Sequence, residues 1–337
     1  MAEVKMKDIA AAVGVSVVTV SNALSGKKGV SEDVRQLVEE TAREMGYDLK
    51  KSEKQSQGTV IGVIASEKYI TVGNSFYWAL YQRVVYEASK QQSVTMLEII
   101  TLDAEKKEEL PKLMKEKAIS GLMIIGWMSR SYVEKLVAAA GVPIVLLDFQ
   151  MKGIRCDAVM SSNYVGMYKM TRYLLERGHR DIAFVGSIEA NENILDRYFG
   201  YKKALMEAGI RVWEDWVLKD RDLGGGQHRV EIPKHMPTAF VCNSDWAAGT
   251  LYEQLTGSGL RVPEDVSIVG YDNYLYGSNF AEKLTTYNVD MKQMAHQAVK
   301  LLQGKIKGDD KYWGTRYIDS VVIERESVRN LNEKMSE

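Results

Sequence analysis

The sequence predicts an α/β protein: a small helical domain at the amino terminus, followed by two lobes built on doubly wound parallel sheets. From Thr59 onward, apolar runs of strand length alternate with longer helical patterns, which is typical of a parallel sheet with helices on both faces. This alternation occurs in two successive series, each too short for one large domain. Residues 6–24 differ, because two short helical patterns are separated there by a single glycine.

The helical pair at the amino terminus has the features of a helix-turn-helix. Apolar residues recur at helical spacing in residues 7–13, Gly14 allows a tight turn, and Ser16 is placed to cap the next helix. The expected inner face consists of Ile9, Ala12 and Val13 on the first helix and Val20, Ala23 and Leu24 on the second. The expected outer face of the second helix consists of Val17, Val18, Ser21 and Asn22. A second helix of this kind fits a DNA major groove, and an ordinary helical hairpin is the alternative.

A third helix is predicted over residues 31–45, with Ser31 as its cap and Gly46 as its stop. Its expected buried stripe is Val34, Leu37, Val38, Thr41, Ala42 and Met45. The three helices would form a domain of residues 1–49. Residues 50–58 are polar, lack apolar periodicity and are interpreted as a linker.

The charge of this small domain does not by itself indicate nucleic-acid binding. The whole chain has a formal net charge of −1, and in the first fifty residues the acidic side chains outnumber the basic ones by one. DNA binding requires positive charge opposite the phosphates. We therefore expect the acidic side chains to gather on the outer face of the third helix.

The remaining pattern gives strands and helices in alternation. The expected strands are residues 60–65, 94–100, 122–126 and 144–148 in the first series, and 182–186, 239–243 and 267–272 in the second. The expected helices include residues 76–91, 104–117, 164–176, 197–208 and 246–257. The last strands are expected over residues 317–323 and beyond, and they should complete both lobes.

Several classes of protein are excluded by what the sequence lacks. Cys156 and Cys242 are far apart and lack metal or redox spacing, so reduced, buried thiols in a cytoplasmic protein are expected. No apolar segment has the length of a membrane span, and no amino-terminal run suggests secretion. Gly224–Gly226 is not followed by the Lys-Ser/Thr of a phosphate-binding loop, and no nucleophile elbow, HExxH or cysteine-rich metal set is present. We expect no enzyme activity, no cofactor and no metal.

Residues 15–24, VSVVTVSNAL, resemble the signature VSxxTVSxxL of the lactose-repressor (LacI/GalR) family of bacterial transcription regulators. Further segments resemble family landmarks in the family's order: residues 178–183, 262–267, 270–273, 284–286 and 324–328. The resemblance covers nearly the whole chain. It gives His179, in the turn of residues 177–180 between a helix and a strand, a structural role.

The resemblance implies a periplasmic-binding-protein type I fold, in which the chain crosses between the lobes more than once. The lobes would then comprise residues 59–161 with about 291–320, and residues 162–290 with about 321–330. It also implies a homodimer, most often a repressor, that binds double-stranded operator DNA and a small-molecule effector in the cleft between the lobes. The dimer would pair through the face near residues 76–87. Residues 330–337 lack leucine heptads, so no coiled-coil tetramerisation tail is expected.

For the DNA interface, Val17 and Val18 are candidates for contact with thymine methyl groups, and Asn22 for an adenine edge. Packing against the other helices is the alternative for the two valines. The candidates for phosphate contacts are Ser16, Thr19, Ser21, Ser31 and Tyr47. Family members often have Arg where this chain has Asn22, and their linker carries an Ala-Arg-x-Leu core that is missing here. Lys50, Lys51 and Lys54 either contact phosphates or belong to a flexible tether.

For the effector site, ligands of parallel sheets bind beyond the carboxyl ends of the strands. Asp272 ends a predicted strand, and the resemblance makes it a hydrogen-bond acceptor for ligand hydroxyls or ring nitrogens. The resemblance also assigns ligand contacts to Arg197 and Asn191. A surface pair with Asp196 is the alternative for Arg197. Asp245 either caps the helix that follows it or contacts the ligand.

Aromatic residues follow several of the predicted strands: Phe76, Tyr77, Trp127, Phe149 and Trp246. Aromatic faces stack on sugar rings and on nucleobases, and packing in the core or between the lobes is the alternative for each one. Together they favour a carbohydrate-type effector. A purine-like or other non-sugar effector, or a solute sensor without DNA activity, remains the alternative function.

Overall fold

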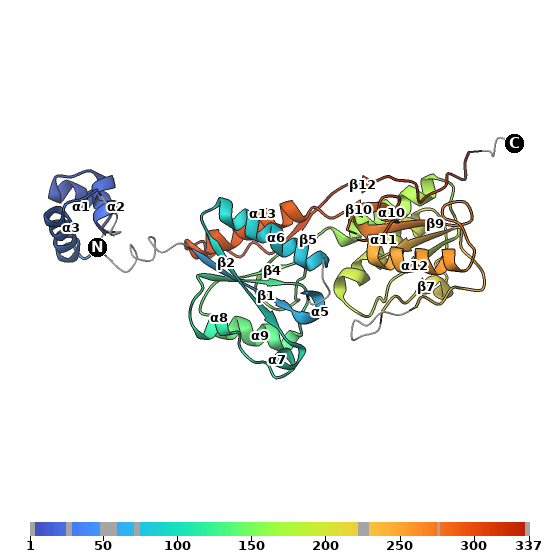
Figure 1. The fold of residues 1–337 in the computed structure, drawn as a ribbon, viewed down its shortest axis with the longest axis horizontal. Coiled ribbons are helices and arrows are strands. Elements are labelled where there is room, and N and C mark those ends of the chain that lie inside the picture. Colours follow the sequence, from blue (N-terminus) through green and yellow to red (C-terminus); the bar gives the residue numbers. More distant parts are fainter. Residues whose placement is uncertain are drawn as a thin grey trace. The chain divides into compact units, whose positions relative to one another are not determined.

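The computed structural model describes residues 4–24, 29–47, 59–70, 75–221, 229–274 and 277–333 (Figure 1). Contacts divide the chain into two compact units. One is Met1–Val60 with Gln92–Val94, and the other is Ile61–Gln91 with Thr95–Glu337. The predicted linker, Lys50, Lys51, Lys54 and Gly224–Gly226 lie outside the described residues.

The amino-terminal headpiece consists of α1 (Met6–Val13), α2 (Val17–Leu24) and α3 (Glu32–Glu44). Gly14 adopts a left-handed conformation with φ 76°, and the Oγ of Ser16 accepts a hydrogen bond of 3.0 Å from the amide of Thr19. The buried apolar residues are Ile9, Ala10, Val20, Ala23, Val38 and Ala42. The predicted helix-turn-helix and the inner face of its second helix are confirmed.

Three details of the headpiece differ from the prediction. Leu37 is half exposed and Ala12 is exposed, whereas Ala10 is buried. The two short partner helices cover only a narrow stripe of α3, which holds Val38 and Ala42 at a spacing of one turn. Ser31 occupies the cap position of α3, but its side chain makes no cap hydrogen bond.

The first lobe is a six-stranded sheet in the order β11-β5-β4-β3-β1-β2. Its strands are β1 (Val60–Ser66), β2 (Val94–Ile100), β3 (Gly121–Ile125), β4 (Ile144–Leu147), β5 (Asp157–Ser161) and β11 (Thr315–Ile318). β1, β3, β4, β5 and β11 pair in parallel, so their carboxyl ends meet at one edge of the sheet. The helices of this lobe are α5 (Glu67–Ile70), α6 (Phe76–Lys90), α7 (Leu102–Lys106), α8 (Lys112–Lys115), α9 (Arg130–Ala139) and α13 (Met291–Ile306).

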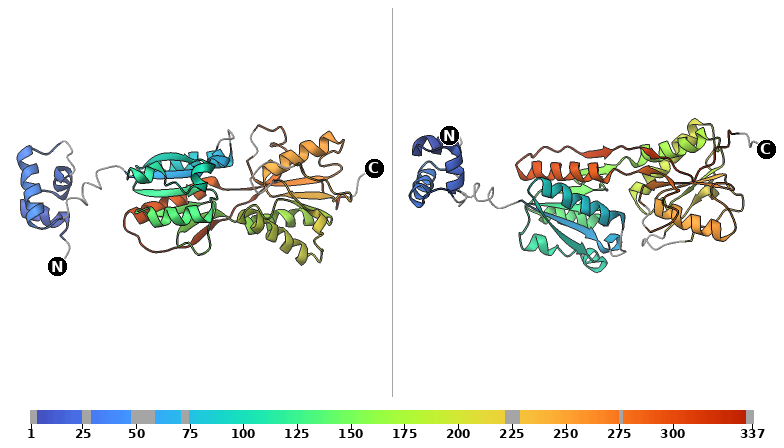
Figure 2. Two further views of the ribbon diagram at one scale, coloured as in Figure 1. Left: turned by 90° about the horizontal axis from the view of Figure 1, so that it is seen from below. Right: turned by 45° about the horizontal axis from the view of Figure 1, so that its top comes forward.

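The second lobe is a six-stranded sheet in the order β12-β10-β9-β8-β6-β7. Its strands are β6 (Ile182–Val185), β7 (Val217–Leu218), β8 (Ala239–Cys242), β9 (Ser267–Asp272), β10 (Thr285–Asn288) and β12 (Val322–Ile323). Only the pairing of β10 with β12 is antiparallel among those described. Its helices are α10 (Asn163–Glu176), α11 (Glu192–Glu207), the 3-10 turn η1 (Glu214–Trp216) and α12 (Asp245–Gly257). Figure 2 shows orange α12 on one face of this sheet and yellow-green α10 and α11 on the other.

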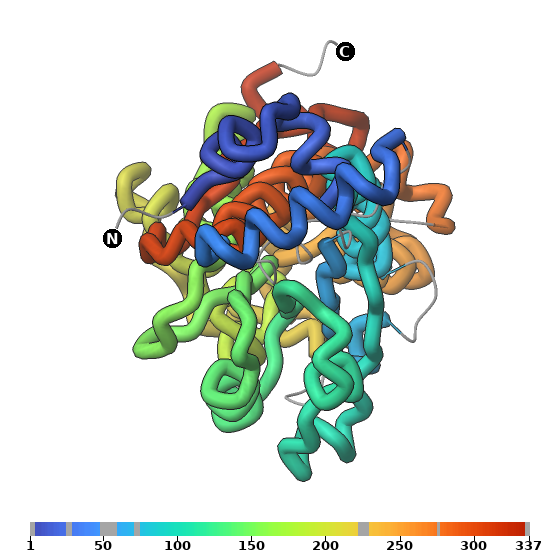
Figure 3. The backbone as a smooth tube through the Cα atoms, turned by 90° about the vertical axis from the view of Figure 1, so that its left-hand side faces the viewer, coloured from blue at the N-terminus to red at the C-terminus, as the bar shows by residue number. Residues whose placement is uncertain are grey.

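The chain passes between the lobes three times: from β5 to α10, from β10 to α13, and from β11 to β12. α13 returns to the first lobe, where it packs against α6 and contacts β3, β4 and β5. Figure 3 shows orange-red α13 beside cyan α6. The predicted class, a helix-turn-helix headpiece with two doubly wound lobes, is confirmed.

One predicted element was wrong. The helix expected over residues 104–117 is broken into α7 and α8, because Glu108 has a positive φ of 54° and Pro111 precedes α8. The last strands, expected over residues 317–323 and beyond, are β11 in the first sheet and β12 in the second. The expectation that they complete both lobes is therefore confirmed.

In the described residues, no single helix is long and apolar enough to cross a membrane. The pair α1 and α2 meets that test only in combination, and the chain bends by 104° between them.

α10 and α11 approach each other closely at Gly200. A Cβ atom at this position would clash with the carbonyl oxygen of Tyr164 and lie 2.9 Å from the amide nitrogen of Tyr168. Backbone atoms cannot swing aside as the end of a flexible side chain can. The two helices therefore depend on the absence of a side chain at residue 200.

We predict that Gly200→Ala lowers the free energy of unfolding by about 3 kcal/mol, because α11 must move away from α10. Urea unfolding followed by circular dichroism measures this. Gly257→Ala is the matched control, since a Cβ at the end of α12 meets nothing within 4 Å. This control should be neutral or slightly stabilising. Equal effects of the two substitutions would contradict the prediction.

Candidate functional site

The outer face of α2 presents two valines to solvent. Val17 is 47% exposed and Val18 is 68% exposed. The alternative in which they pack against the other headpiece helices is therefore wrong. Ser16 and Thr19 lie beside them, with their hydroxyl oxygens 2.8 Å apart. Ser21 and Asn22 are partly buried on the same helix. The arrangement is an apolar pair bordered by hydroxyl and amide groups.

Most of the exposed acidic side chains of the headpiece lie on α3. The Glu32 side chain is 88% exposed, and Asp33, Glu40 and Glu44 are also exposed, all on α3. The exposed Lys5 and Lys7 lie at the start of α1. Arg35 donates a hydrogen bond of 2.7 Å to the carbonyl oxygen of Ala23 and thereby ties α3 to the end of α2. The acidic face expected on α3 is thus present.

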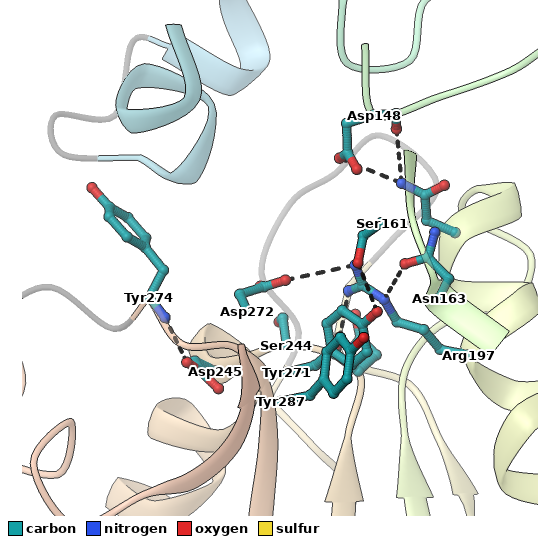
Figure 4. A network of polar contacts seen from close by, with 12 residues as sticks. Asp148, Ser161, Asn163, Arg197, Ser244, Asp245, Tyr271, Asp272, Tyr274 and Tyr287 are labelled. Atoms are coloured by element: carbon teal, nitrogen blue, oxygen red, sulfur yellow. Dashed lines mark hydrogen bonds and ion pairs between the residues drawn. The ribbon is translucent and has the colours of Figure 1, made fainter. Parts of the chain in front are cut away.

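In the larger unit, two aspartates stand at the carboxyl ends of central strands, one in each lobe. Asp148 follows β4 and Asp272 ends β9. Both have a positive φ, 65° for Asp148 and 119° for Asp272, which is unfavourable for a residue other than glycine. Strained backbone of this kind clusters at functional sites, and Figure 4 shows both side chains directed toward the same region as Arg197.

The guanidinium of Arg197 is buried and makes contacts on every side (Figure 4). Its Nε donates to Asn163 Oδ1 at 2.8 Å, and one Nη donates to the carbonyl oxygen of Asn243 at 2.5 Å. The other Nη lies 3.6 Å from Asp272 Oδ1. The guanidinium also stacks on the ring of Tyr271, 3.9 Å from its centroid. The surface pair between Arg197 and Asp196, the alternative interpretation, is wrong.

Two buried polar atoms near Arg197 have no hydrogen-bond partner among the described residues: Asp148 Oδ1 and Asn163 Nδ2. The other carboxylate oxygen of Asp148 accepts a hydrogen bond of 3.0 Å from the hydroxyl of Tyr77. Buried polar groups are nearly always satisfied, because an unpaired one costs about 1–3 kcal/mol. One free acceptor and one free donor therefore mark this region as a place where a ligand can bind.

Burial sets the protonation of the carboxyl groups. It raises the pKa of Asp148 to about 6, although Arg197 and the Tyr77 hydroxyl oppose the shift. It also raises the pKa of Asp272 well above its usual value, opposed by Arg197 and reinforced by the charges of Asp245 and Asp148. The charges of Asp245 and Asp148 thus disfavour ionisation of Asp272, whereas the charge of Arg197 favours ionisation of all three carboxyl groups.

Asp245 has a structural role that the sequence did not indicate. Its two oxygens accept from the Thr286 hydroxyl at 2.5 Å and from the Tyr274 amide at 2.7 Å. Burial raises its pKa to about 7, although these hydrogen bonds oppose the shift. The cap of α12 is Ser244, whose Oγ accepts from the amide of Ala247 at 3.2 Å. The expectation that Asp245 caps this helix is wrong, and its carboxylate instead fixes the loop after β9.

Asn191 is the cap of α11, since its Oδ1 accepts from the amide of Ile194 at 3.0 Å. Its neighbour Asn193 crosses to the other lobe, where its Nδ2 donates to the carbonyl oxygen of Asp148 at 2.9 Å. Ser161 and Tyr271 make a second contact between the lobes, with their hydroxyl oxygens 3.0 Å apart. The carboxyl edges of both sheets are thereby joined around Arg197.

The aromatic candidates have different surroundings. The ring of Phe76 meets that of Tyr274 from the other lobe, edge to face, at 6.2 Å between centroids. Trp127 lies under the ammonium of Lys68 at 4.9 Å, and Trp246, partly exposed, lies under Arg221 at 5.7 Å. Phe149 is almost completely buried, so it packs in the core, which was the alternative interpretation.

Sequence reasoning missed Asp148, Asn163, Asn193 and Tyr271 as members of this network. Asp148 could have been found, because it ends a predicted strand in the same way as Asp272. Nothing in the sequence indicated the role of Asn193, because its hydrogen-bond partner, Asp148, lies in the other lobe and 45 residues away.

Other polar side chains have structural roles. The ring nitrogens of His179 lie 3.0 Å from Thr238 Oγ1 and 3.0 Å from the carbonyl oxygen of Arg329, as expected for a structural turn. Cys242 is buried and Cys156 is partly exposed, and neither forms a disulfide.

Comparison with known proteins identifies two segments. Residues 5–48 match the model of bacterial regulatory proteins of the lacI family, and residues 171–328 match a periplasmic binding protein-like domain. The transcriptional regulator RegA of Clostridium saccharobutylicum is 30% identical over 340 residues, covering 96% of this chain and 98% of RegA. The repressor PurR of Pectobacterium carotovorum is 29% identical, covering 96% of each chain. The ribose operon repressor of Haemophilus influenzae is 27% identical, covering 97% of this chain and 99% of that protein.

Solved structures agree on the fold. The lac repressor dimer bound to operator and the anti-inducer ONPF has a TM-score of 0.69 at 21% identity, over 97% of this chain and all of that one. The regulator CelR in complex with cellobiose has a TM-score of 0.67 at 22% identity, over 96% of this chain and all of CelR. Given the lacI-type headpiece, the binding-protein-like lobes and full-length relatives at 30% identity, the chain belongs to the lacI family of DNA-binding transcriptional regulators.

Proposed function

We propose that this regulator is a cytoplasmic repressor whose affinity for operator DNA is controlled by a small polyhydroxylated effector of the carbohydrate type. The observation that carries the proposal is a pair of buried atoms beside the buried Arg197, Asp148 Oδ1 and Asn163 Nδ2, which have no hydrogen-bond partner within the described ranges. A hydroxyl group both donates and accepts, so neighbouring hydroxyls of one ligand can satisfy both atoms.

The DNA contacts of the proposal lie on α2. Val17 and Val18 suit the thymine methyl groups, and Asn22 suits an adenine edge. The phosphate contacts are assigned to hydroxyl groups around this helix and to the ends of α3: Ser16, Thr19, Ser21, Ser31 and Tyr47. The acidic face of α3 would point away from the duplex.

A homodimer on a pseudo-palindromic operator follows from the small size of the headpiece, which alone makes few contacts with DNA. We assign the dimer contact to the first lobe, at α6 and the edge strand β2. Val85 and Tyr86 of α6 and Met96 and Ile99 of β2 are exposed there. Exposed apolar side chains grouped in this way are typical of interfaces.

The effector contacts proposed are Asp148 and Asn163 together with the family candidates Arg197, Asp272 and Asn191. Phe76, Tyr77, Trp127 and Trp246 would supply aromatic faces for the C–H groups of a sugar ring. Asp245 and Phe149 would not contact the effector, since Asp245 accepts a hydrogen bond from the Tyr274 loop and Phe149 is buried in the core.

Regulation would arise from linkage between this site and DNA. A ligand that favours one arrangement of the two lobes changes the spacing of the two headpieces in the dimer. By reciprocity, an inducer and DNA weaken each other's binding, and a corepressor and DNA strengthen it. A purine-like effector is the second candidate, since the same aromatic faces stack on nucleobases and Asp272 can accept from ring nitrogens.

We predict that Asn22→Ala lowers operator affinity by about 1–3 kcal/mol, and that Val18→Ala lowers it by about 1 kcal/mol, because each removes a base contact. Operators selected from random DNA, followed by fluorescence anisotropy, provide the measurement. Leu37→Ala is the matched control, because Leu37 is a half-exposed apolar residue on α3. If this control lost as much affinity as Val18→Ala, the assignment to α2 would be wrong.

We predict that sugars or sugar derivatives, and not purines, raise the melting temperature of the purified chain. Asp148→Asn should then weaken effector binding by about 1.5–3 kcal/mol, because it replaces a charged acceptor without changing its shape. Thermal shift and isothermal titration calorimetry measure the two effects. The exposed Asp215→Asn serves as the control. A purine that stabilised the chain when no sugar did would establish the second candidate.

The raised carboxyl pKa values predict opposite pH trends for binding and stability. As the pH falls from neutral through about 6, protonation of Asp148 removes an acceptor, so effector affinity should fall by up to about tenfold per pH unit. Over the same range the unliganded chain should become more stable, because the folded state takes up protons that the unfolded state does not. Calorimetry and urea unfolding at several pH values test both. Affinity that rose on acidification would contradict the assignment of Asp148.

A further inference from the structure

A groove of about 1130 Å³ lies on the outer side of α10 and α11, next to the edge strand β11. Five large apolar residues that line it are exposed: Tyr164, Val165, Phe199, Met206 and Tyr317. An apolar patch of this kind on the surface of a single chain marks a binding surface for another molecule. We call these five residues and the charged residues between them the α11 patch.

The α11 patch is separate from the face assigned to the dimer. Tyr317 lies on β11, and β11 and β2 are the two opposite edges of the first sheet. A chain can therefore use both surfaces at the same time.

The charges of the α11 patch identify its partner. Asp196, Phe199, Lys203 and Met206 follow each other at intervals of three, four and three residues, so they share one face of α11. Lys202 and Glu207 border the same groove. The patch thus contains acidic and basic side chains in equal number around an apolar centre. A surface of this composition is complementary to itself.

We propose that the α11 patch binds the α11 patch of a second copy of this chain through a two-fold contact. When two copies of α11 run antiparallel and cross near Phe199, Asp196 of each copy faces Lys203 of the other. The Phe199 and Met206 side chains then fill the two grooves between them. With the dimer face on the opposite edge, this contact joins two dimers into a tetramer that needs no coiled-coil tail.

The central test is the mass of the full-length chain, measured by light scattering and by sedimentation over a range of concentrations. The wild type should form tetramers, and Phe199→Glu should weaken that association by about 100-fold, because it sets two like charges against each other at the centre of the contact. Trp213→Glu is the matched control, since Trp213 is an exposed aromatic residue outside the patch. Circular dichroism confirms that each variant is folded.

Charge exchange provides a second test that does not depend on the apolar centre. Asp196→Lys and Lys203→Asp should each weaken the association, and the double variant should restore it, because the two-fold pairing is then re-formed with reversed signs. If Phe199→Glu reduces a wild-type dimer to monomers, the contact between two α11 patches is confirmed, whereas the tetramer and the assignment of the dimer face to α6 and β2 are wrong. If Phe199→Glu has the same mass in solution as the wild type, the proposal is overturned, and the groove binds a small apolar ligand or another protein instead.

Discussion

The buried guanidinium of Arg197 is the interaction on which the effector-binding unit depends. A charge removed from water is tolerated only when hydrogen bonds and opposite charge replace its hydration. Here those partners come from three elements: Asn163 at the start of α10, the Asn243 carbonyl after β8, and Asp272 at the end of β9. Arg197 therefore fixes the carboxyl edge of the second sheet from within.

The polar network around Arg197, called the polar centre below, still contains unfavourable interactions. Asp148, Asp245 and Asp272 are buried carboxyl groups with raised pKa values, and the charge of Arg197 acts on all three. Asp148 Oδ1 has no hydrogen-bond partner in the part of the chain that the structure describes. The strained φ of Asp148 and Asp272 adds to the unfavourable free energy. A ligand that donates hydrogen bonds to these oxygens lowers the free energy of the whole group. Asn193 and the Ser161–Tyr271 pair join the two lobes at this point, so binding at the centre and the arrangement of the lobes share the same contacts.

How much the sequence could predict depended on how local each signal is. Strands such as β3 and β4 were found because they are continuous apolar runs, whereas β5 and the two-residue β7 are too short or too polar to stand out. The family motif located Arg197 and Asp272. The role of Asp245 could not be found, because its hydrogen-bond partners Tyr274 and Thr286 are 29 and 41 residues away and only the fold brings them together. Leu37 was misplaced because burial depends on which neighbours are long enough to cover it.

α11 connects the two surfaces that matter most in the larger unit. Arg197 points into the polar centre, while its neighbour Asp196 lines the groove on the opposite side. Asn163 belongs to both, since it accepts from Arg197 and also lines the groove. An effector that draws Arg197 toward itself changes the hydrogen bond to Asn163, and so changes the wall of the groove. Thermodynamic linkage then requires the reverse effect: a molecule bound in the groove alters the affinity of the centre by the same factor.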